Sequence, residues 1–286
     1  MNELINVNAD ATDFSMLYSS VIDSGPNLAR AKINKDSTTE YNGDTVEGIP
    51  APSISLNHPE YGEVFSKDTY FRIFAETMQT SVYDADQQKF ANISEHFQDF
   101  QKVANDWMGG DKCGWVSNAE REKLRVEDPV AFANASKAKL SRNLFGLIRM
   151  DNPIAPSGAT VEFKDVPFRI KLGPSSFFEI SQVIKSMRKQ SCEPLNFDIK
   201  IGFELKKAGS NKYFVLKYTP LLSERHALTD VTRPYISDFV DLIHKENMHV
   251  KSKMKDNMVP PNITQKVKTD MDQILEGNVI DDEIPF

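Results

Sequence analysis

Alternating apolar and polar side chains predict β-strands in the first and central parts of this chain. The segments concerned are rich in β-branched and aromatic residues, and neighbouring side chains within them change character at each step. Because successive side chains of a strand point to opposite sides, each segment offers one apolar and one polar face. The predicted strands cover residues 64–83 (one long strand or a hairpin), 89–93, 142–150, 160–172, 196–207 and 212–220.

A second spacing, with apolar residues three or four positions apart, predicts helices between and after these strands. The clearest stripe consists of Phe177, Ile180, Ile184 and Met187, which follow a serine pair at 175–176. We expect these serines to cap the helix through their hydroxyl groups. The other predicted helices cover 94–105, 117–125, 128–138, 230–249 and 262–276, with a linker at 251–257.

The order of these elements predicts an α+β fold around an OB-fold-like, five-stranded β-barrel. Counting 64–83 first, the order is strand, strand, strand, helix, strand, strand, as in an OB-fold. Other small barrels and α+β sheets produce the same order. The expected organisation is a flexible N-terminal arm at 1–53, a core at 54–225 with a helical insertion at 94–138, a helical segment and linker at 226–276, and an acidic tip at 277–286.

Charge is distributed unevenly along the chain, which carries a net charge of −7 over 286 residues. Residues 137–217 hold 15 Lys and Arg against 7 Asp and Glu, a balance of +8, so the remainder carries −15. A basic centre within an acidic chain indicates an electrostatic surface for nucleic acid, flanked by acidic segments.

The composition argues against several classes of protein. Cys113 and Cys192 are the two cysteines, which are too few for a disulfide framework and fit a reducing cytoplasm. The five histidines have no zinc-site spacing with these cysteines, so we expect neither a metal nor a cofactor. There is no run of about 18 apolar residues that would predict a membrane span, and no secretory signal pattern at the start. We therefore expect a cytoplasmic protein without a membrane partner.

One face of the predicted strands combines cations with aromatic rings. Cations neutralise phosphates and release counterions, while exposed rings stack on bases at roughly 1–3 kcal/mol per base. A sequence-independent binder of single-stranded DNA needs these groups; the alternative is a solvated outer face, with Trp115 in the core of the insertion. The candidate DNA-binding residues are Tyr70, Arg72, Trp115, Arg142, Phe145, Arg149, Arg169, Lys171, Lys200, Lys206, Tyr213 and Lys217.

The chain ends in a short pattern that is typical of a peptide hook for partner proteins. An acidic run, attracted to basic surfaces, precedes an apolar end in which a proline restricts the backbone and lowers the ordering cost of binding. The terminal ring fits an apolar pocket, and the terminal carboxylate suits an Arg or Lys at its edge. A solvated chain end explains the acids but not the apolar residues. The tip residues are Asp281, Asp282, Glu283, Ile284, Pro285 and Phe286.

This tip closely resembles the C-terminus of bacterial single-stranded DNA-binding proteins, which ends in an acidic run followed by Ile-Pro-Phe. In that family, the tip docks onto replication and repair proteins and competes with DNA for the OB groove. The rest of the chain differs from that family, because it lacks the Gly/Gln/Pro-rich linker. Residues 109–114, followed by the strands at 139–218, instead resemble single-stranded DNA-binding proteins of tailed bacteriophages. The two resemblances imply a phage protein in a bacterial host cell, without transferring any DNA-contact residue.

Three rival functions compete with this interpretation. An enzyme is disfavoured, since the chain has no P-loop, Gly-x-Ser-x-Gly, His-Glu-x-x-His or nuclease-like carboxylate cluster, and we expect no catalytic residues. A recombination mediator or strand-annealing protein would also bind single strands. An adaptor to replication proteins would keep the hook without DNA affinity. We expect sequence-independent binding and protection of single-stranded DNA in replication, recombination and repair, with host or phage proteins recruited through the tip.

Overall fold

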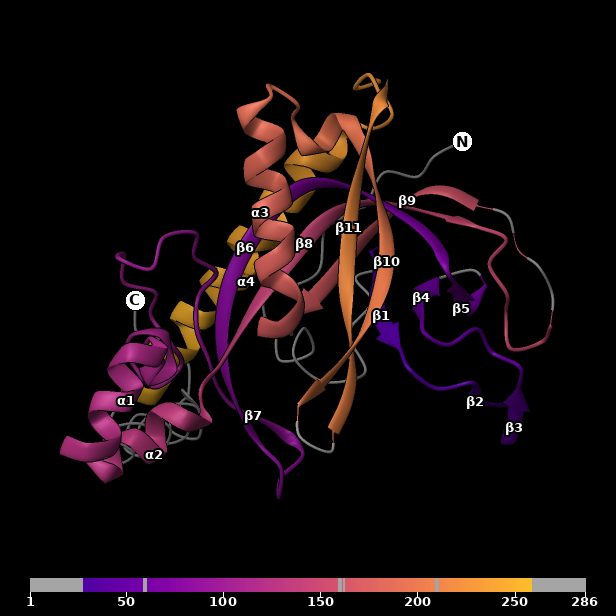
Figure 1. The fold of residues 1–286 in the computed structure, drawn as a ribbon. Helices are drawn as coiled ribbons and strands as arrows, with labels where there is room; N and C mark the ends of the chain where they lie inside the picture. Colours follow the sequence, from indigo (N-terminus) through magenta and orange to yellow (C-terminus); the bar gives the residue numbers. More distant parts are fainter. Residues whose placement is uncertain (1–27, 59–60, 159–160, 162, 209–210, 259–286) are drawn as a thin grey trace, which may run out of the picture.

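The computed structural model describes residues 28–258 apart from 59–60, 159–160, 162 and 209–210. Within these residues the fold is mixed α and β, with one large, mostly open sheet and few helices (Figure 1). The strands are β1 (Ala29–Asn34), β2 (Thr38–Tyr41), β3 (Asp44–Glu47), β4 (Ser53–His58), β5 (Gly62–Ser66), β6 (Asp68–Asp84), β7 (Lys89–Ile93), β8 (Lys139–Asp151), β9 (Phe163–Leu172), β10 (Phe197–Ala208) and β11 (Asn211–Arg225). The helices are α1 (Asn118–Glu127), α2 (Pro129–Lys137), α3 (Pro174–Lys189) and α4 (Pro234–Met258), with 3₁₀ turns η2 (Lys112–Gly114) and η3 (Pro194–Asn196).

The main sheet has nine strands, in the order β11-β10-β6-β8-β9-β1-β4-β5, and β7 pairs with β6. Its pairings are antiparallel except for the parallel pair β1–β9. Strands β2 and β3 form a separate hairpin. Among the described residues no pairing joins β11 to β9, so the predicted five-stranded closed barrel is not what this part of the chain displays. Each of the six predicted strand regions nevertheless contains a strand among its described residues.

Strands β6 and β8 form the long central pair of the sheet, and a bulge between Ile73 and Ala75 bends it. Gly146 lies opposite Ile73 at this bend. A Cβ atom at Gly146 would lie 1.9 Å from the carbonyl oxygen of Arg72. Only glycine permits this close approach of two backbones, so the bulge depends on the absence of a side chain.

Helix α3 covers the apolar face of the sheet and completes the main core. Its inner side chains Ile180, Ile184 and Met187 are at most 2% exposed and share one cluster with β8 residues such as Leu144 and Ile148. Each fully buried side chain of this kind contributes about 1.5–3 kcal/mol relative to exposure. The predicted apolar stripe on α3 is therefore the side of the helix that packs on the sheet.

The predicted serine cap of α3 is wrong. Gly173 occupies the N-cap position without a side-chain hydrogen bond, and Pro174 begins the helix. The hydroxyl of Ser176 instead accepts a hydrogen bond from the backbone N–H of Leu216 on β11, at 3.4 Å. Pro174 has its φ angle already set for the first helical position, and the carbonyl of Gly173 accepts from the backbone N–H groups of Ser176 and Phe177, so the helix starts without a serine side-chain cap.

Helix α4 lies on the other side of β6 and β8, behind the sheet as seen in Figure 1. It confirms the predicted helix at 230–249, but the predicted linker at 251–257 is wrong because the helix continues to Met258. Its inner side includes the buried side chains Phe239, Glu246 and Val250. Near its end, Asn257 donates a hydrogen bond to the carbonyl of Trp107 at 2.7 Å, which holds the last turns against the insertion.

Residues 28–53, predicted to belong to a flexible arm, contain strands β1 to β3 and lead into β4. Ala29, Ala31, Ile54 and Leu56 on β1 and β4 are at most 2% exposed and belong to the main core. The arm prediction failed because two small alanines among polar residues make a weak strand pattern, which the parallel pairing with β9 stabilises. Residues 1–27 and the predicted helix at 262–276 lie outside the described residues.

The insertion at 94–138 is helical only in its second half. Residues 94–105 form isolated bridges and turns rather than the predicted helix, and Phe97 packs on Met78 of β6. The predicted helices at 117–125 and 128–138 are confirmed as α1 and α2, which begin at local caps: the hydroxyl of Ser117 accepts a bond from the backbone N–H of Glu120, and the Asp128 side chain caps α2. These caps act within one helical turn, so the local sequence is enough to predict them. At 94–105, the apolar spacing favours a helix, but packing of the same side chains on the sheet favours another conformation.

Candidate nucleic-acid interface

Seven of the twelve predicted DNA-binding residues lie on one face of the sheet, on the side of α4. The cross-strand register establishes this, because residues directly opposite each other share a face. Tyr70 on β6 lies between Arg149 on β8 and Lys200 on β10, and Phe145 lies opposite Arg169 on β9. We call this surface the α4-side face; its predicted members are Tyr70, Arg72, Phe145, Arg149, Arg169, Lys171 and Lys200.

One end of the α4-side face is open to solvent and has an aromatic ring between two cations. The guanidinium carbon of Arg149 lies 3.9 Å from the ring centroid of Tyr70, and the Lys200 Nζ lies 5.8 Å from it. The side chains of Arg149 and Lys200 are 28% and 45% exposed. Arg149 also pairs with Asp198 at 3.1 Å, and Lys200 pairs with Asp68 at 3.2 Å. The Lys200–Asp68 pair is exposed and therefore weak, so Lys200 can exchange its carboxylate for another anion, whereas Asp198 is buried.

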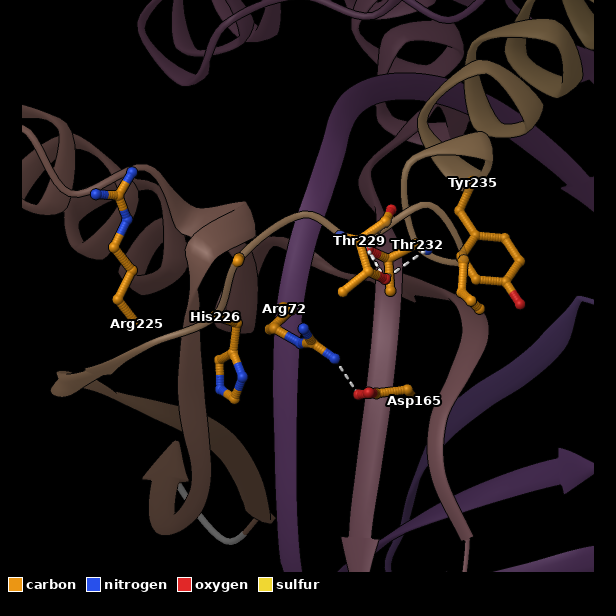
Figure 2. Close-up of a pocket in the computed structure, with 9 residues that line it drawn as sticks. Arg72, Asp165, Arg225, His226, Thr229, Thr232 and Tyr235 are labelled. Carbon is orange, nitrogen blue, oxygen red and sulfur yellow. Dashed lines mark hydrogen bonds and ion pairs between the residues drawn. The ribbon is translucent and has the colours of Figure 1, made fainter.

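Next to this end, the buried Arg72 forms the wall of an open pocket of about 470 Å³. Figure 2 shows Arg72 and Asp165 facing each other between His226 and Tyr235, and the guanidinium of Arg72 is ion-paired with Asp165. The Arg72 Nε also lies 3.6 Å from Asp198. With carboxylates from β9 and β10 near it, Arg72 ties β6 to these two strands and is less available to a ligand than the sequence pattern suggested.

The other end of the α4-side face is covered by α4. Phe145 is 0% exposed, and its ring centroid lies 6.0 Å from that of Phe239 on the helix. The guanidinium of Arg169 lies over the same Phe145 ring, with its carbon 5.4 Å from the centroid. Arg169 Nη1 donates to the Glu246 carboxylate at 2.6 Å, and Nη2 donates to the side-chain oxygen of Asn143 at 3.2 Å.

Glu246 also belongs to a buried polar chain that joins the helix to the insertion. His96 Nε2 bonds to the second carboxylate oxygen of Glu246, while His96 Nδ1 lies 2.8 Å from the Thr77 hydroxyl. A neutral imidazole that donates from Nε2 accepts from Thr77 at Nδ1, so each group in the chain has a partner. The backbone N–H of His96 donates to Asn247 at 2.6 Å, which adds a second tie to α4.

The pKa directions follow from this burial and crowding of charge. Burial lowers the pKa of His96, although its hydrogen bond to Glu246 opposes the shift. Burial alone would raise the pKa of Glu246, but Arg169 and His96 outweigh it and bring the pKa to about 2. The chain therefore contains a neutral imidazole and an ionised carboxylate at neutral pH.

Sequence reasoning missed one member of the α4-side face, Arg30 on β1, because this residue fell within the supposed arm. Arg30 is in register with Arg169 across the parallel pairing. Partial burial lowers the pKa of Arg30 to about 10, and Arg169 adds repulsion. The surrounding protein lowers the pKa of Lys171 to about 8, with further repulsion from Arg169 and Arg30, although the Lys171 side chain still reaches solvent. Arg169 thus contacts the carboxylate of Glu246 directly, and Arg30 and Lys171 lie within its electrostatic influence.

The β10–β11 hairpin holds three further predicted residues. Lys206 and Tyr213 are paired across the strands, and the Lys206 side chain is 41% exposed. Lys217 is bound to two acids, since its Nζ bonds to Glu179 of α3 and lies 2.8 Å from Glu204. Lys206 and Tyr213 remain candidates for nucleic-acid contact, whereas Lys217 ties α3 to the hairpin.

Arg142 and Trp115 do not belong to the α4-side face. Arg142 lies opposite Met78 on the α3 side, where it is ion-paired with Glu76 and its guanidinium carbon lies 5.5 Å from the Phe177 ring centroid. Its inclusion was wrong, because a residue three positions before Phe145 points to the opposite side of an alternating strand. Trp115 stacks on Phe100 of the insertion at 5.3 Å between ring centroids, at the margin of a small apolar cluster.

The C-terminal tip, Asp281–Phe286, lies outside the described residues. In the part of the chain that the structure describes, no group of three or more His, Cys, Asp or Glu side chains is placed to hold a metal ion. No helix among these residues is long and apolar enough to cross a membrane. In comparisons with known proteins, no family model matches the chain, and no curated protein or solved structure is significantly similar to it.

Proposed function

We propose that this protein binds single-stranded DNA without reading its sequence, through the α4-side face of the sheet. The observation that carries the proposal is the cross-strand register, which gathers cations and rings from β10, β6, β8 and β9 on one surface. The pairings of β11, β10, β6, β8 and β9 also follow one another as the five predicted strands of an OB-fold-like core would. Such a core binds oligonucleotides on one face of its sheet.

The chemistry of the open end suits this role. Arg149 and Lys200 flank the Tyr70 ring, so a base that stacks near the ring has two cations within reach of its phosphates. Their carboxylate partners Asp198 and Asp68 hold the cations in place when DNA is absent. Exchange of a carboxylate for a phosphate costs little at an exposed site and releases counterions from the DNA.

The C-terminal tip has a separate role in the proposal. Residues 281–286 recruit host or phage replication and repair proteins, while the folded domain holds the strand. The support is the resemblance of Asp-Asp-Glu-Ile-Pro-Phe to the tip of bacterial single-stranded DNA-binding proteins. The proposal places the protein in the cytoplasm of a bacterial host and includes protection of the strand during replication, recombination and repair.

A second candidate is an adaptor that binds replication proteins through the tip and has no DNA affinity. It is favoured by the carboxylate partners of Arg72, Arg149 and Arg169, which already neutralise much of the positive charge on the α4-side face. A strand-annealing protein would share the surface of the first proposal and differ only in activity.

Titration of a labelled oligo-dT strand and a matched duplex, at about 50 mM and about 200 mM salt, tests the proposal. We expect binding of the single strand that weakens with salt, and weaker binding of the duplex. In the variant R149A/K200A, affinity should fall, and the slope of log K against log salt should decrease by roughly 0.7 for each phosphate that is no longer neutralised. The control K185A/K189A removes two exposed cations from α3 on the opposite side. An equal fall in affinity in both variants would contradict binding at the open end of the α4-side face, and no single-strand preference would favour the adaptor.

A further inference from the structure

We propose that α4 is a displaceable cover on the nucleic-acid surface, and that Glu246 occupies the position that a DNA phosphate takes when the helix is released. This inference rests on the proposed function and adds a mechanism of regulation to it. In the covered state, the end of the α4-side face with Phe145 and Arg169 is closed to a ligand. In the released state, the face is continuous from Lys200 on β10 to Arg30 on β1.

The first argument is the excess of cations around one carboxylate. Arg30, Arg169 and Lys171 lie on the neighbouring strands β1 and β9, and the carboxylate of Glu246 attracts all three. Burial is the larger cause of the lowered pKa values of Arg30 and Lys171, and the repulsion among the three cations adds to it. Arg30 and Arg169 lie in register on neighbouring strands beside the carboxylate of Glu246, and such a gathering of like charges attracts anions.

The second argument is a surplus of hydrogen-bond donors at the same place. Asn143 is 0% exposed and its side-chain oxygen accepts from Arg169, but its amide nitrogen has no hydrogen-bond acceptor within the described residues. A buried polar group without a partner costs free energy and calls for an explanation. A carboxylate has two oxygens, both of which Glu246 already uses with Arg169 and His96. A phosphate brings more acceptor oxygens to the same donors.

The third argument is the aromatic contact beneath the helix. Phe239 on α4 packs on Phe145 with an interplanar angle of 44° and on Phe74 at 86°. Phe145 is thus an aromatic ring with a cation, Arg169, on its face and with a ring from α4 as its cover. When α4 leaves, a base can take the place of Phe239 on this ring, as in other stacking platforms for single strands.

The attachment of α4 permits this release. The helix is joined to β11 at one end through residues 226–233, and its outer side chains Val240 and Met248 are exposed, so it is packed on one side only. The apparent DNA affinity then equals the affinity of the open form reduced by the fraction of molecules that are open. Any change that weakens docking of α4 without touching the cations should tighten DNA binding.

Two variants of the full-length chain test this inference by titration with oligo-dT. E246Q removes the carboxylate charge, and N247A removes the side chain that holds the His96 backbone. We expect both to bind roughly five- to tenfold more tightly than the wild type, within the range of typical coupling between sites. The matched control is D241N, which removes the same charge from an exposed position on α4 and should change the affinity less than about twofold. Thermal melting establishes that each variant is folded.

Hydrogen–deuterium exchange on the wild-type protein keeps the test independent of the variants. On saturation with oligo-dT, amides of α4 should exchange faster and those of β8 and β9 more slowly. Unchanged or slower exchange in α4 of the DNA-bound protein, or equal affinities of E246Q and D241N, would overturn the displaceable cover while leaving DNA binding intact. Absence of oligo-dT binding in the wild type and in every variant would overturn the proposed function and the cover together.

Discussion

Lowering the pH should weaken the docking of α4, because the helix is held by a buried histidine. His96 is 8% exposed and lies between the hydroxyl of Thr77 and the carboxylate of Glu246. Burial lowers its pKa below the ordinary value of 6.5, against the opposing effect of the Glu246 hydrogen bond. The folded protein therefore keeps a neutral imidazole at a pH at which the unfolded chain has taken up a proton.

The sign and the size of the effect follow from this difference. A group with a lowered pKa in the folded state contributes its full stability above the unfolded pKa and loses it as the pH falls. Between about pH 7.5 and about pH 5.5, protonation of the unfolded His96 removes up to about 1.4 kcal/mol from the free energy of unfolding. Glu246, with a pKa of about 2, stays ionised across this range and does not add to the slope.

Urea unfolding of the wild type and of H96Q at both pH values measures this contribution. Glutamine keeps an N–H donor for Glu246 but cannot take up a proton, so H96Q should lose less stability than the wild type over the same range, by up to about 1.4 kcal/mol. His249 also has a pKa lowered by burial. Separate measurement of H249Q gives the share of His249 in the loss of stability between the two pH values. Equal losses in the wild type and H96Q would show that His96 is not held neutral in the fold, and the argument would fail.

Three further predictions concern packing and the chain end. F239A should lower the free energy of unfolding by about 3–5 kcal/mol, since the ring is 3% exposed among three aromatic neighbours. V240A on the exposed side of α4 should change it by less than about 0.5 kcal/mol, and urea unfolding compares the two variants. G146A should lower the free energy of unfolding by at least about 1–3 kcal/mol, because its new Cβ would lie 1.9 Å from a backbone oxygen. G202A places its Cβ 3.6 Å from the nearest side chain, so thermal melting should show a much smaller loss of stability for this variant. Removal of Phe286 alone should leave oligo-dT binding unchanged and abolish the capture of replication proteins; loss of both would point to a folding role.

Much of the fold was predictable because its signals are local. The strand regions were recognised by alternation of side chains, and the caps at Ser117 and Asp128 act within a single helical turn. The alternation also placed Tyr70 and Arg149 correctly on a polar face. By contrast, β1 was missed, since its two alanines are buried only because strand β9 lies beside them.

The helix prediction at 94–105 failed for a related reason. Its apolar spacing fits a helix, but Phe97 packs on Met78 and Ala104 joins the same small cluster beside the sheet. The backbone N–H groups of Ser94 and Phe97 donate to β6, and that of Glu95 donates to the distant carbonyl of Asn105 instead of following a helical ladder. Packing on a sheet thus overrides a local preference that amounts to only a few tenths of a kcal/mol per residue.

The sequence by itself determined most of the central strands and helices, which side of these strands is polar, and where cations and rings alternate. Only the tertiary structure decided which of these side chains remain accessible, because this depends on where α4 packs. Arg169 and Glu246 are 77 positions apart, and His96 and Glu246 are 150 apart. No periodicity relates residues at such separations. Their contact arises when the buried stripe of α4 covers a face of the sheet, and that packing converts an apparently open basic surface into a partly closed one.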